Sequence, residues 1–303
     1  MRQLGPKAGG SVAPANGAVW CVIIESGEPV AASIRISSRN ARFQQWQALL
    51  SNRQKRQRAG EFLVQGVRPI TMAIQHGWPL RAIIYDAERS LSRWAADILR
   101  TTTTLLVAMT TDLIRELGEK PDDPPELIAV AEIPPDAFAR IQPGADFLAL
   151  AFDRPSSPGN IGTLIRSADA FGAVGVVITG HAADPYDPKS VRASTGSVFA
   201  VPTVRDPSSQ VVPVWILALR ATLADLAIVG TDENGTVDID DCDLTQPTLL
   251  VIGNESTGLS AAWRESCDVI ARIPIGGSAS SLNAANAGTI ALYETARQRR
   301  SRR

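Results

Sequence analysis

Three short polar loops, each following an apolar run, carry the residue types that could hold and orient a reactive ligand. The first spans residues 153–162 and leads into a helix that carries Arg166. Glycine and proline shape this turn, and Asn160 can cap the start of the helix. Arg166 comes six residues after Asn160, more than one helical turn on, where its guanidinium could reach a phosphate. Taken alone, the loop is also typical of an ordinary strand-to-helix turn with a surface arginine.

The second and third loops offer polar groups of a different kind. Residues 253–259 read Gly-Asn-Glu-Ser-Thr-Gly-Leu after a fully apolar run, so Gly253 permits a close backbone approach and Glu255 lies in a tight polar turn. Residues 273–283 are mostly small and lead directly into the last helix, so their backbone N–H and C=O groups could bind a polar ligand. Each of these loops could equally be a simple turn or linker.

Continuous apolar runs predict the strands that position these loops. The runs occupy residues 147–152, 174–179, 226–230, 248–253 and 269–273, and helical patterns occupy residues 161–171 and 282–299. Continuous Val/Ile/Leu strands that alternate with helices indicate a parallel sheet covered on both faces. Ligands bind beyond the carboxyl ends of the strands in such sheets. We therefore expect an α/β fold with the three loops at one edge of its sheet.

The N-terminal half predicts a second, smaller α/β domain. Ser38 can cap a helix whose apolar face carries Phe43, Trp46, Leu49 and Leu50. Strand and helix patterns then alternate at residues 62–64, 69–76, 80–85, 92–100, 105–108, 111–117 and 127–130. This alternation is typical of a compact α/β unit.

Composition sets the domain boundaries. Residues 1–34 are rich in Gly, Ala, Pro and Ser and are expected to form a disordered extension, with ordered structure starting near Ser37. A turn-rich stretch at residues 134–146 separates the two halves. We therefore predict a domain over residues 35–135 and a second domain over residues 144–303.

The distribution of charge is more informative than the net charge of −1. Seven basic residues and no acid lie from Arg35 to Arg58, and five arginines and no acid lie from Arg297 to Arg303. Residues 59–296 hold 16 basic and 29 acidic residues, a net charge of −13. Two basic ends around an acidic middle suggest local contact with a polyanion. A solvated helix face and a frayed tail explain the pattern equally well.

Several other classes of site have no support in the sequence. The cysteines (Cys21, Cys242, Cys267) lack metal or redox spacing, and His76 and His181 are the only histidines, so neither a metal site nor Ser-His-Asp chemistry is expected. The glycine motifs of dinucleotide-binding folds and of phosphate-loop NTPases do not occur. No apolar run is long enough to span a bilayer, and the start lacks a signal-sequence pattern. We expect a cytoplasmic protein without membrane contact.

In this order and spacing, the three loops resemble the SpoU/TrmH branch of the SPOUT RNA 2′-O-ribose methyltransferases. Asn160 with Arg166 matches the first family motif, residues 253–258 match the second, and residues 273–283 match the third. Ile275 stands where the wider family usually has Met, which preserves apolar character. The segments 38–46, 61–64 and 187–192 resemble, more narrowly, the avilamycin-resistance ribosomal RNA methyltransferases of actinomycetes.

The resemblance implies an S-adenosylmethionine-dependent enzyme that methylates a ribose 2′-hydroxyl of RNA. By the narrower similarity, the target is a uridine of 23S ribosomal RNA and the outcome is resistance to an orthosomycin antibiotic. The implied architecture is an L30e-like α/β domain that holds RNA, followed by a SPOUT parallel sheet with a deep trefoil knot, which is rare among folds. Family members act as homodimers with the site near the subunit interface.

The resemblance also implies roles for individual residues. The catalytic set comprises Asn160, Arg166, Glu255, Ser281 and Asn283. The cofactor-binding set comprises Thr179, Gly180, Gly253, Asn254, Gly258, Ile273, Ile275, Ser281 and Leu282. Together with the charge pattern, it predicts that a basic helix from Arg39 to Arg58 grips RNA phosphates. The RNA-binding set comprises Arg39, Arg42, Arg53, Lys55, Arg56, Arg58, Lys189 and Arg192.

The family proposal makes Arg166 the base, but a guanidinium has too high a pKa to accept a proton readily. We prefer a role in which Arg166 binds the phosphate beside the target ribose and that phosphate or a water receives the proton. Rival interpretations remain: a transfer RNA methyltransferase, a non-enzymatic RNA-binding protein, and more distantly a nicotinamide-dependent oxidoreductase. The complete set of motif residues argues against a non-enzymatic protein.

Overall fold

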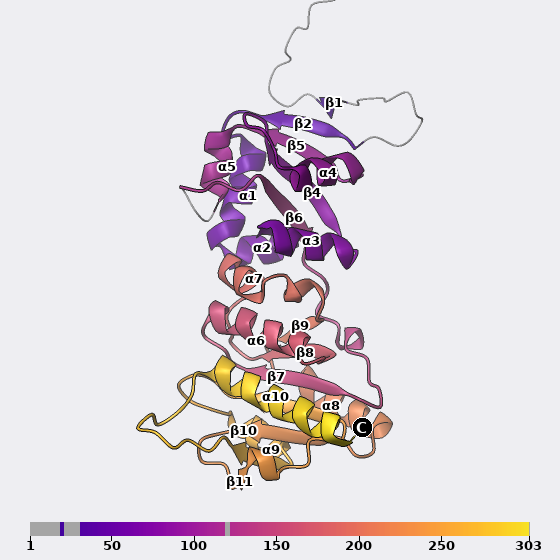
Figure 1. Cartoon of the computed structure of the whole chain (residues 1–303), viewed down its shortest axis with the longest axis vertical. Helices are drawn as coiled ribbons and strands as arrows, with labels where there is room; N and C mark the ends of the chain where they lie inside the picture. The colour runs from indigo at the N-terminus through magenta and orange to yellow at the C-terminus, as the bar shows by residue number, and fades with distance from the viewer. Residues whose placement is uncertain (1–18, 21–30, 119–121, 303) are drawn as a thin grey trace, which may run out of the picture. The chain divides into compact units, whose positions relative to one another are not determined.

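The computed structural model describes residues 19–20, 31–118 and 122–302 (Figure 1). The chain forms two compact units, one of Met1–Gln47 with Arg81–Ile128 and one of Ala48–Leu80 with Ala129–Arg303. Residues 48–80, predicted to belong to the N-terminal domain, thus group with the C-terminal half. The boundaries of independently folding domains stay a prediction. The expected disorder of residues 1–34 falls mostly on residues outside the described part.

Parallel strands form the centre of the first unit. In this unit β2 (Ser33–Ile36) pairs with β5 (Leu105–Met109), and β5 pairs with β4 (Leu80–Asp86), all in parallel. The short β1 (Val19–Trp20) adds to β2 in the antiparallel sense. Ordered structure therefore begins before Ser37. Two helices, α4 (Arg93–Thr101) and α5 (Thr111–Leu117), match the predicted patterns.

The expected basic helix from Arg39 to Arg58 is wrong, because the chain forms two helices there. They are α1 (Ala41–Ser51) and α2 (Arg53–Ala59). Asn52 between them is extended, and its side chain accepts a hydrogen bond from the Lys55 N–H at 3.0 Å, which starts the second helix. The predicted cap of the first helix is also wrong, since Asn40 rather than Ser38 accepts from the Phe43 N–H at 3.0 Å.

The second unit contains further elements before its main sheet. They are β3 (Glu61–Gln65), α3 (Val67–Gln75), residues 129–132 of β6 (Leu127–Glu132) and a short 3-10 turn (Phe138–Arg140). β6 and β3 are neighbours in their sheet. Phe62 of β3 is fully buried and lies against the ring of Tyr186, with centroids 4.8 Å apart. Aromatic packing therefore ties this early segment to the C-terminal part of the same unit.

A seven-stranded sheet in the order β11-β13-β10-β12-β7-β8-β9 forms the core of the second unit. Its strands are β7 (Leu148–Asp153), β8 (Gly175–Thr179), β9 (Thr203–Asp206), β10 (Ala227–Thr231), β11 (Val237–Asp238), β12 (Thr248–Ile252) and β13 (Val269–Arg272). Each neighbouring pair is parallel. The five residues of β12 are all buried, as expected for a central strand covered on both faces. The predicted parallel sheet is confirmed.

Helices cover both faces of this sheet. On one face α6 (Pro158–Ala170) packs between α7 (Pro188–Ser194) and α10 (Ala284–Arg302). On the other face α8 (Val211–Thr222) and α9 (Ala261–Ser266) bury Trp215 and Trp263 against Ala149 and Val251. The sequence did not predict α7, α8 and α9. The helix α8 is apolar on nearly all sides, with Arg220 only in its last turn, so it shows little helical periodicity.

The last helix approaches its neighbours very closely. A Cβ atom on Gly288 would lie 2.5 Å from Leu164 Cδ1 on α6 and 3.2 Å from Ile252 Cγ1 on β12. Arg299 near the end of α10 donates to the carbonyls of Asp146 at 2.8 Å and Gln246 at 2.6 Å. The basic C-terminal run is therefore bound to the sheet rather than frayed at Arg299. The trefoil knot stays a prediction.

Within the described ranges, no helix is both long and apolar enough to cross a membrane.

Candidate active site

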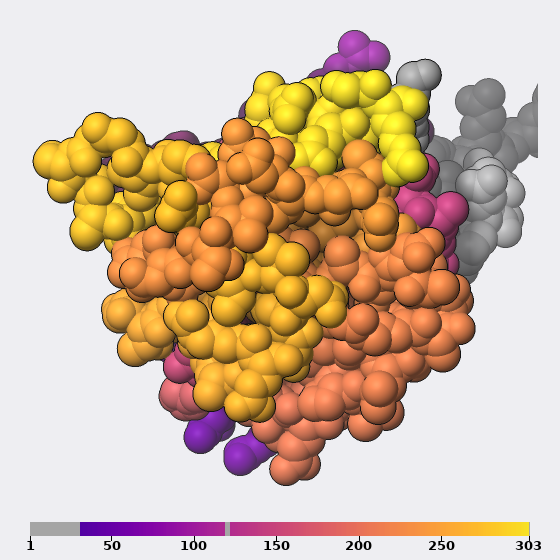
Figure 2. Space-filling view, turned by 90° about the horizontal axis from the view of Figure 1, so that it is seen from below, coloured from indigo at the N-terminus to yellow at the C-terminus, as the bar shows by residue number. Residues whose placement is uncertain are grey.

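The three polar loops follow β7, β12 and β13, which are parallel strands of one sheet, so they leave it at the same edge. β7 and β12 are neighbours, and β10 lies between β12 and β13. The loop before α10, residues 273–283, projects from the body of the unit (Figures 1 and 2). The three loops therefore leave the sheet close to one another. The hydrogen bonds between their side chains show where they meet.

A chain of side-chain hydrogen bonds joins the three loops. The Asn160 Nδ2 group donates to Glu255 Oε1 at 2.9 Å. The Asn283 Nδ2 group donates to Asn160 Oδ1 at 3.1 Å. Asn160 thus links the second loop to the third through one amide, and Asn283 also begins α10 by accepting from the Ala285 N–H at 3.0 Å. Because N and O of an amide differ in role, both asparagines have fixed orientations in this chain.

Glu255 is the acceptor at one end of that chain. Its Oε2 atom accepts from the N–H and the hydroxyl of Ser156, both at 3.0 Å. Partial burial raises the pKa of this carboxyl, but the hydrogen bonds from Ser156 and Asn160 outweigh it, and the net pKa lies below the usual value. Glu255 is therefore an anion that the first loop holds in place.

The predicted helix cap in the first loop is corrected. Ser157 caps α6, since its hydroxyl accepts from the Asn160 N–H at 3.4 Å. Asn160 lies inside the first turn, so its side chain is free to join Glu255 and Asn283 instead of closing the helix end. A capping serine three residues upstream thus frees Asn160 for the site.

A cavity of about 380 Å³ opens beside this cluster. Most of the predicted cofactor residues line it, namely Gly253, Asn254, Gly258, Ile273, Ile275, Ser281 and Leu282, together with Glu255. Ile275 and Leu282 are 39% and 37% exposed, which is unusual for large apolar side chains. A volume of this size and a mixed apolar and polar lining are typical of small-molecule sites.

Two predicted cofactor residues lie outside that cavity. Thr179 is fully buried, donates to Asp153 Oδ1 at 3.2 Å and accepts from Trp263 Nε1 at 3.1 Å. Gly180 lies against the Arg154 side chain. The structure therefore gives both residues structural neighbours and does not bring them to the cavity wall.

Arg166 also lies apart from the cluster. It is exposed on α6, about 9 Å along the helix axis from Asn160. Over residues 19–20, 31–118 and 122–302 it has no hydrogen bond or ion pair, and it is absent from the cavity lining. Its guanidinium is thus available to an external anion.

The predicted RNA-binding residues differ in their exposure and in their protein partners. The side chains of Arg42, Lys55, Arg58, Lys189 and Arg192 are exposed. Arg39 forms an ion pair with Glu116 in the first unit. Arg53, half-buried, donates to the Ala182 carbonyl at 2.5 Å.

Arg56 is wrongly placed in the RNA-binding set, because it is 1% exposed and is held by protein groups. Its Nε donates to Asp184 at 2.8 Å, and its Nη2 lies 3.2 Å from Asp187. Its Nη1 donates to the Leu49 carbonyl at 2.7 Å. Arg56 therefore fixes α2 against the start of α7 and cannot contact a phosphate.

Several cavity residues escaped the sequence analysis. The cavity is also lined by Thr231 at the end of β10, by Asp232, Glu233 and Asn234 after it, and by Arg264 of α9. Asp232 forms an ion pair with Arg264. The run at residues 226–230 was predicted as a strand, so the polar residues beyond its carboxyl end were the signal that could have found them. In the described part of the chain, no cluster of three His, Cys, Asp or Glu residues could hold a metal ion.

Comparison with known proteins gives consistent matches to both halves of the chain. Residues 40–129 match the SpoU L30e-like domain, and residues 148–293 match the SpoU rRNA Methylase family. The 23S rRNA (uridine(2479)-2′-O)-methyltransferase of Streptomyces viridochromogenes is 61% identical over 277 residues, which cover 91% of this chain and 96% of that protein.

Solved structures agree with the sequence matches. The SpoU methyltransferase AviRb from Streptomyces viridochromogenes, in complex with AdoMet, superposes with a TM-score of 0.84 at 61% identity, over 87% of this chain and 99% of that chain. The AdoMet-bound rRNA methyltransferase from Sinorhizobium meliloti gives a TM-score of 0.76 at 30% identity, over 88% and 98% of the two chains.

Proposed function

The chain belongs to the SpoU rRNA methylase family, and we propose that it transfers a methyl group from S-adenosylmethionine to the ribose 2′-hydroxyl of a uridine in 23S ribosomal RNA. The observation that carries this proposal is the hydrogen-bonded chain from Glu255 through Asn160 to Asn283, beside the cavity. It joins all three family motifs at one place. The 61% identity to a 23S rRNA uridine 2′-O-methyltransferase supplies the substrate.

The cavity residues fit S-adenosylmethionine. Ile275 and Leu282 offer apolar surface that a bound adenosine would cover, and Glu233 adds a carboxylate to those of Asp232 and Glu255. Arg264 pairs with Asp232, but Glu233 and Glu255 leave the lining with a net negative charge, which suits a ligand that carries positive charge. When bound, S-adenosylmethionine supplies a methyl group on a cationic sulfur. The sulfur leaves as a neutral thioether, so the leaving group needs no acid. The chain must then position the ribose and allow its hydroxyl proton to leave.

We assign positioning to the motif cluster and phosphate binding to Arg166. Asn160, Ser281 and Asn283 hold the edge of the cavity where the ribose must enter, and Glu255 anchors Asn160. Arg166 is exposed and unpaired within the described residues, so it can bind the phosphate beside the target ribose. The phosphate or a water then accepts the hydroxyl proton, since a guanidinium remains charged.

Exposed cations of the second unit would hold more of the RNA backbone. Lys55 and Arg58 of α2 and Lys189 of α7 lie on elements that the buried Arg56 joins through Asp184 and Asp187. Their positive charge is free to neutralise phosphates and release counterions. Arg56 thus contributes to this surface indirectly, by fixing the two helices that carry it.

We further propose that the enzyme is a cytoplasmic homodimer. Ile290 and Tyr293 of α10 are 37% and 49% exposed, and a second copy would cover such apolar surface. We also propose that methylation confers resistance to an orthosomycin antibiotic, as the narrower family resemblance implies.

The direct rival keeps the reaction but changes the substrate to transfer RNA. Several relatives carry the name tRNA/rRNA methyltransferase, for example one from Mycobacterium avium that is 30% identical over 78% of this chain. Incubation with tritiated S-adenosylmethionine and equal amounts of unmodified 23S ribosomal RNA or bulk transfer RNA separates the two. The proposal expects label in 23S ribosomal RNA. Label in transfer RNA alone would replace the proposed substrate.

A further inference from the structure

Arg154, the first residue after β7, connects the first and second loops through its side chain. We infer that Arg154 is a positioning residue, which holds the Asn254–Gly258 loop in the arrangement that binds the cofactor and presents Glu255. Neither the motif analysis nor the family resemblance assigned it a role. The inference rests on the proposed function for the identity of the ligand.

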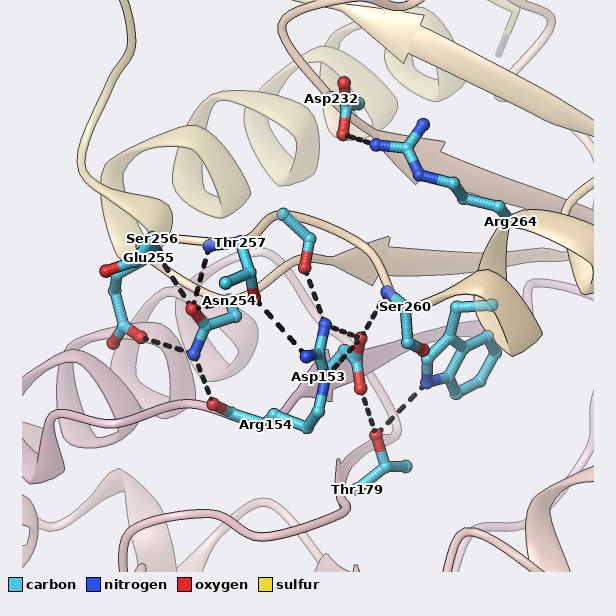
Figure 3. A network of polar contacts seen from close by, with 12 residues as sticks. Asp153, Arg154, Thr179, Asp232, Asn254, Glu255, Ser256, Thr257, Ser260 and Arg264 are labelled. Carbon is cyan, nitrogen blue, oxygen red and sulfur yellow. Dashed lines mark hydrogen bonds and ion pairs between the residues drawn. The ribbon is translucent and has the colours of Figure 1, made fainter.

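The guanidinium of Arg154 contacts both sides of the site (Figure 3). Its Nη2 donates to the Gly258 carbonyl at 3.0 Å and to Asp153 Oδ2 at 3.0 Å. Its Nη1 donates to the Thr257 hydroxyl at 3.3 Å. The planar fork of arginine can make these bonds together, which a lysine ammonium cannot do in the same geometry. The far end of the second loop is therefore fastened to the end of β7.

The backbone of Arg154 holds the near end of the same loop. Its carbonyl accepts from Asn254 Nδ2 at 2.7 Å, and the same Nδ2 lies 3.4 Å from Glu255 Oε2. Asn254 Oδ1 in turn accepts from the Ser256 and Thr257 N–H groups. Residues 254–258 are thus hydrogen-bonded at one end to the Arg154 carbonyl and at the other end to the Arg154 side chain. The loop lines the cavity and carries Glu255.

Buried Asp153 makes the arrangement rigid. Its side chain is 2% exposed and accepts from Arg154, from the Thr179 hydroxyl and from the Ser260 N–H at 2.8 Å. Ser260 follows directly after the second loop. Asp153 therefore binds the residue that ends the loop, while Arg154 binds Thr257 and Gly258 within it. The buried carboxylate needs the guanidinium as a partner, which keeps Arg154 in place.

The backbone at Arg154 adopts a strained conformation. Arg154 adopts φ of +51°, which is uncommon for a residue other than glycine. A Cβ atom on Gly180 would lie 2.7 Å from Arg154 Cγ, and Gly180 itself adopts φ of +67°, so the path of the arginine and the local backbone both favour glycine at position 180. Strain that persists at a site is a reason to look for function there. Glycine at position 180 thus leaves space for Arg154 and accepts the positive φ.

The substitution Arg154→Gly separates positioning from general stability, because glycine accepts φ of +51° without strain and removes the guanidinium. If loss of the side chain leaves only about a tenth of the molecules with a competent loop, the apparent Kd for S-adenosylmethionine rises about tenfold. Calorimetric titration of the full chain measures this. Arg154→Lys, which keeps charge but not the fork, should give a smaller increase. The matched control is Ser209→Gly, another residue at positive φ, 55°, which is exposed and should bind normally.

A second readout does not depend on the ligand. Hydrogen exchange of the Asn254 and Gly258 N–H groups, which bond each other's carbonyls, should become faster in Arg154→Gly while exchange in β12 is unchanged. Failure of the wild type to bind S-adenosylmethionine would sink the proposed function but leave this test standing. Unchanged exchange and an unchanged Kd would overturn the positioning role.

Gly180→Ala covers the case in which Arg154→Gly unfolds because Asp153 loses its partner. It keeps both charged residues but displaces the Arg154 side chain. Because Gly180 adopts φ of +67°, the control for backbone strain is Gly172→Ala, at φ of +75° with nothing within 4 Å of the added Cβ atom. We expect faster exchange in the same loop and weaker binding of S-adenosylmethionine. Wild-type values for both measurements in folded Gly180→Ala would contradict the inference.

Discussion

The side-chain amide of Asn160 donates to Glu255 Oε1 at 2.9 Å, although the two residues are 95 positions apart in the chain. Asn160 also accepts from Asn283, so its side chain links the second loop to the third. Replacement Asn160→Ala removes one hydrogen bond to a charged group, which is worth about 1.5–3 kcal/mol. We expect methyl transfer to fall by roughly tenfold to a hundredfold. The control is Asn286→Ala on the exposed side of α10, which should transfer at the normal rate.

The lowered pKa of Glu255 makes part of the stability depend on pH. A carboxyl whose pKa is lower in the folded state stabilises the fold above its unfolded-state value and loses that contribution as pH falls through the folded-state pKa. We expect the stability difference between wild type and Glu255→Gln to be largest near neutral pH and to shrink below pH 4.5, the usual value of the group.

Urea unfolding at a series of pH values measures this difference. Glu265→Gln, at an exposed position of α9, controls for the change in net charge. A difference that grows on acidification would show that the hydrogen bonds from Ser156 and Asn160 do not hold Glu255 as an anion.

Lys55 and Arg56 are adjacent in sequence, but truncation of Lys55 should change RNA binding and truncation of Arg56 should change folding stability. Lys55 is exposed, so Lys55→Ala should flatten the slope of log binding constant against log salt concentration by about 0.7–0.9 for one lost phosphate contact. The side chains of Arg56 and Asp184 are only 2% and 3% exposed. Arg56→Ala leaves buried carboxylates without their partner and should cost about 3–5 kcal/mol of folding stability. Filter binding to 23S ribosomal RNA fragments and thermal unfolding measure the two effects. Equal losses of stability in both variants would refute this division of roles.

Gly162 is the contact point of α6 and α7. A Cβ atom there would lie 2.1 Å from the Ser190 carbonyl and 2.9 Å from the Ser194 nitrogen, both backbone atoms that cannot move aside easily. We expect Gly162→Ala to destabilise the fold by about 1–3 kcal/mol through overpacking. Gly159→Ala on the same helix is the matched control, because its Cβ would meet only the Ser157 hydroxyl at 3.6 Å. If both variants unfold at the same urea concentration, the close packing of these helices is refuted.

The sequence was informative where apolar runs are continuous. The runs at residues 147–152 and 248–253 are central buried strands, and their character follows from burial on both faces. The three motifs were found because their polar residues follow such strands. Their junction through Asn160 was only implied by the family resemblance, since a hydrogen bond between residues 95 positions apart depends on strand order.

Tertiary contacts account for what the sequence could not show. Arg56 looks like its exposed neighbours in a basic segment, and only the fold brings Asp184 and Asp187 to it. Asp232 and Arg264 carry no motif and meet because β10 lies beside β12 and β13. Arg154 resembled an ordinary turn residue until its positive φ and its bonds to the second loop were visible.

We propose that the three loops deliver a methyl group to a ribose oxygen of 23S ribosomal RNA. The most direct test uses two 23S RNA fragments that differ only by a 2′-deoxyuridine at the modified position, located beforehand by mapping on the unmodified RNA. The wild type should place one tritiated methyl group on the ribose fragment and none on the deoxy fragment, while Arg166→Ala should bind S-adenosylmethionine and transfer almost nothing. Equal labelling of both fragments, or a methyl group found on the base, would contradict the account.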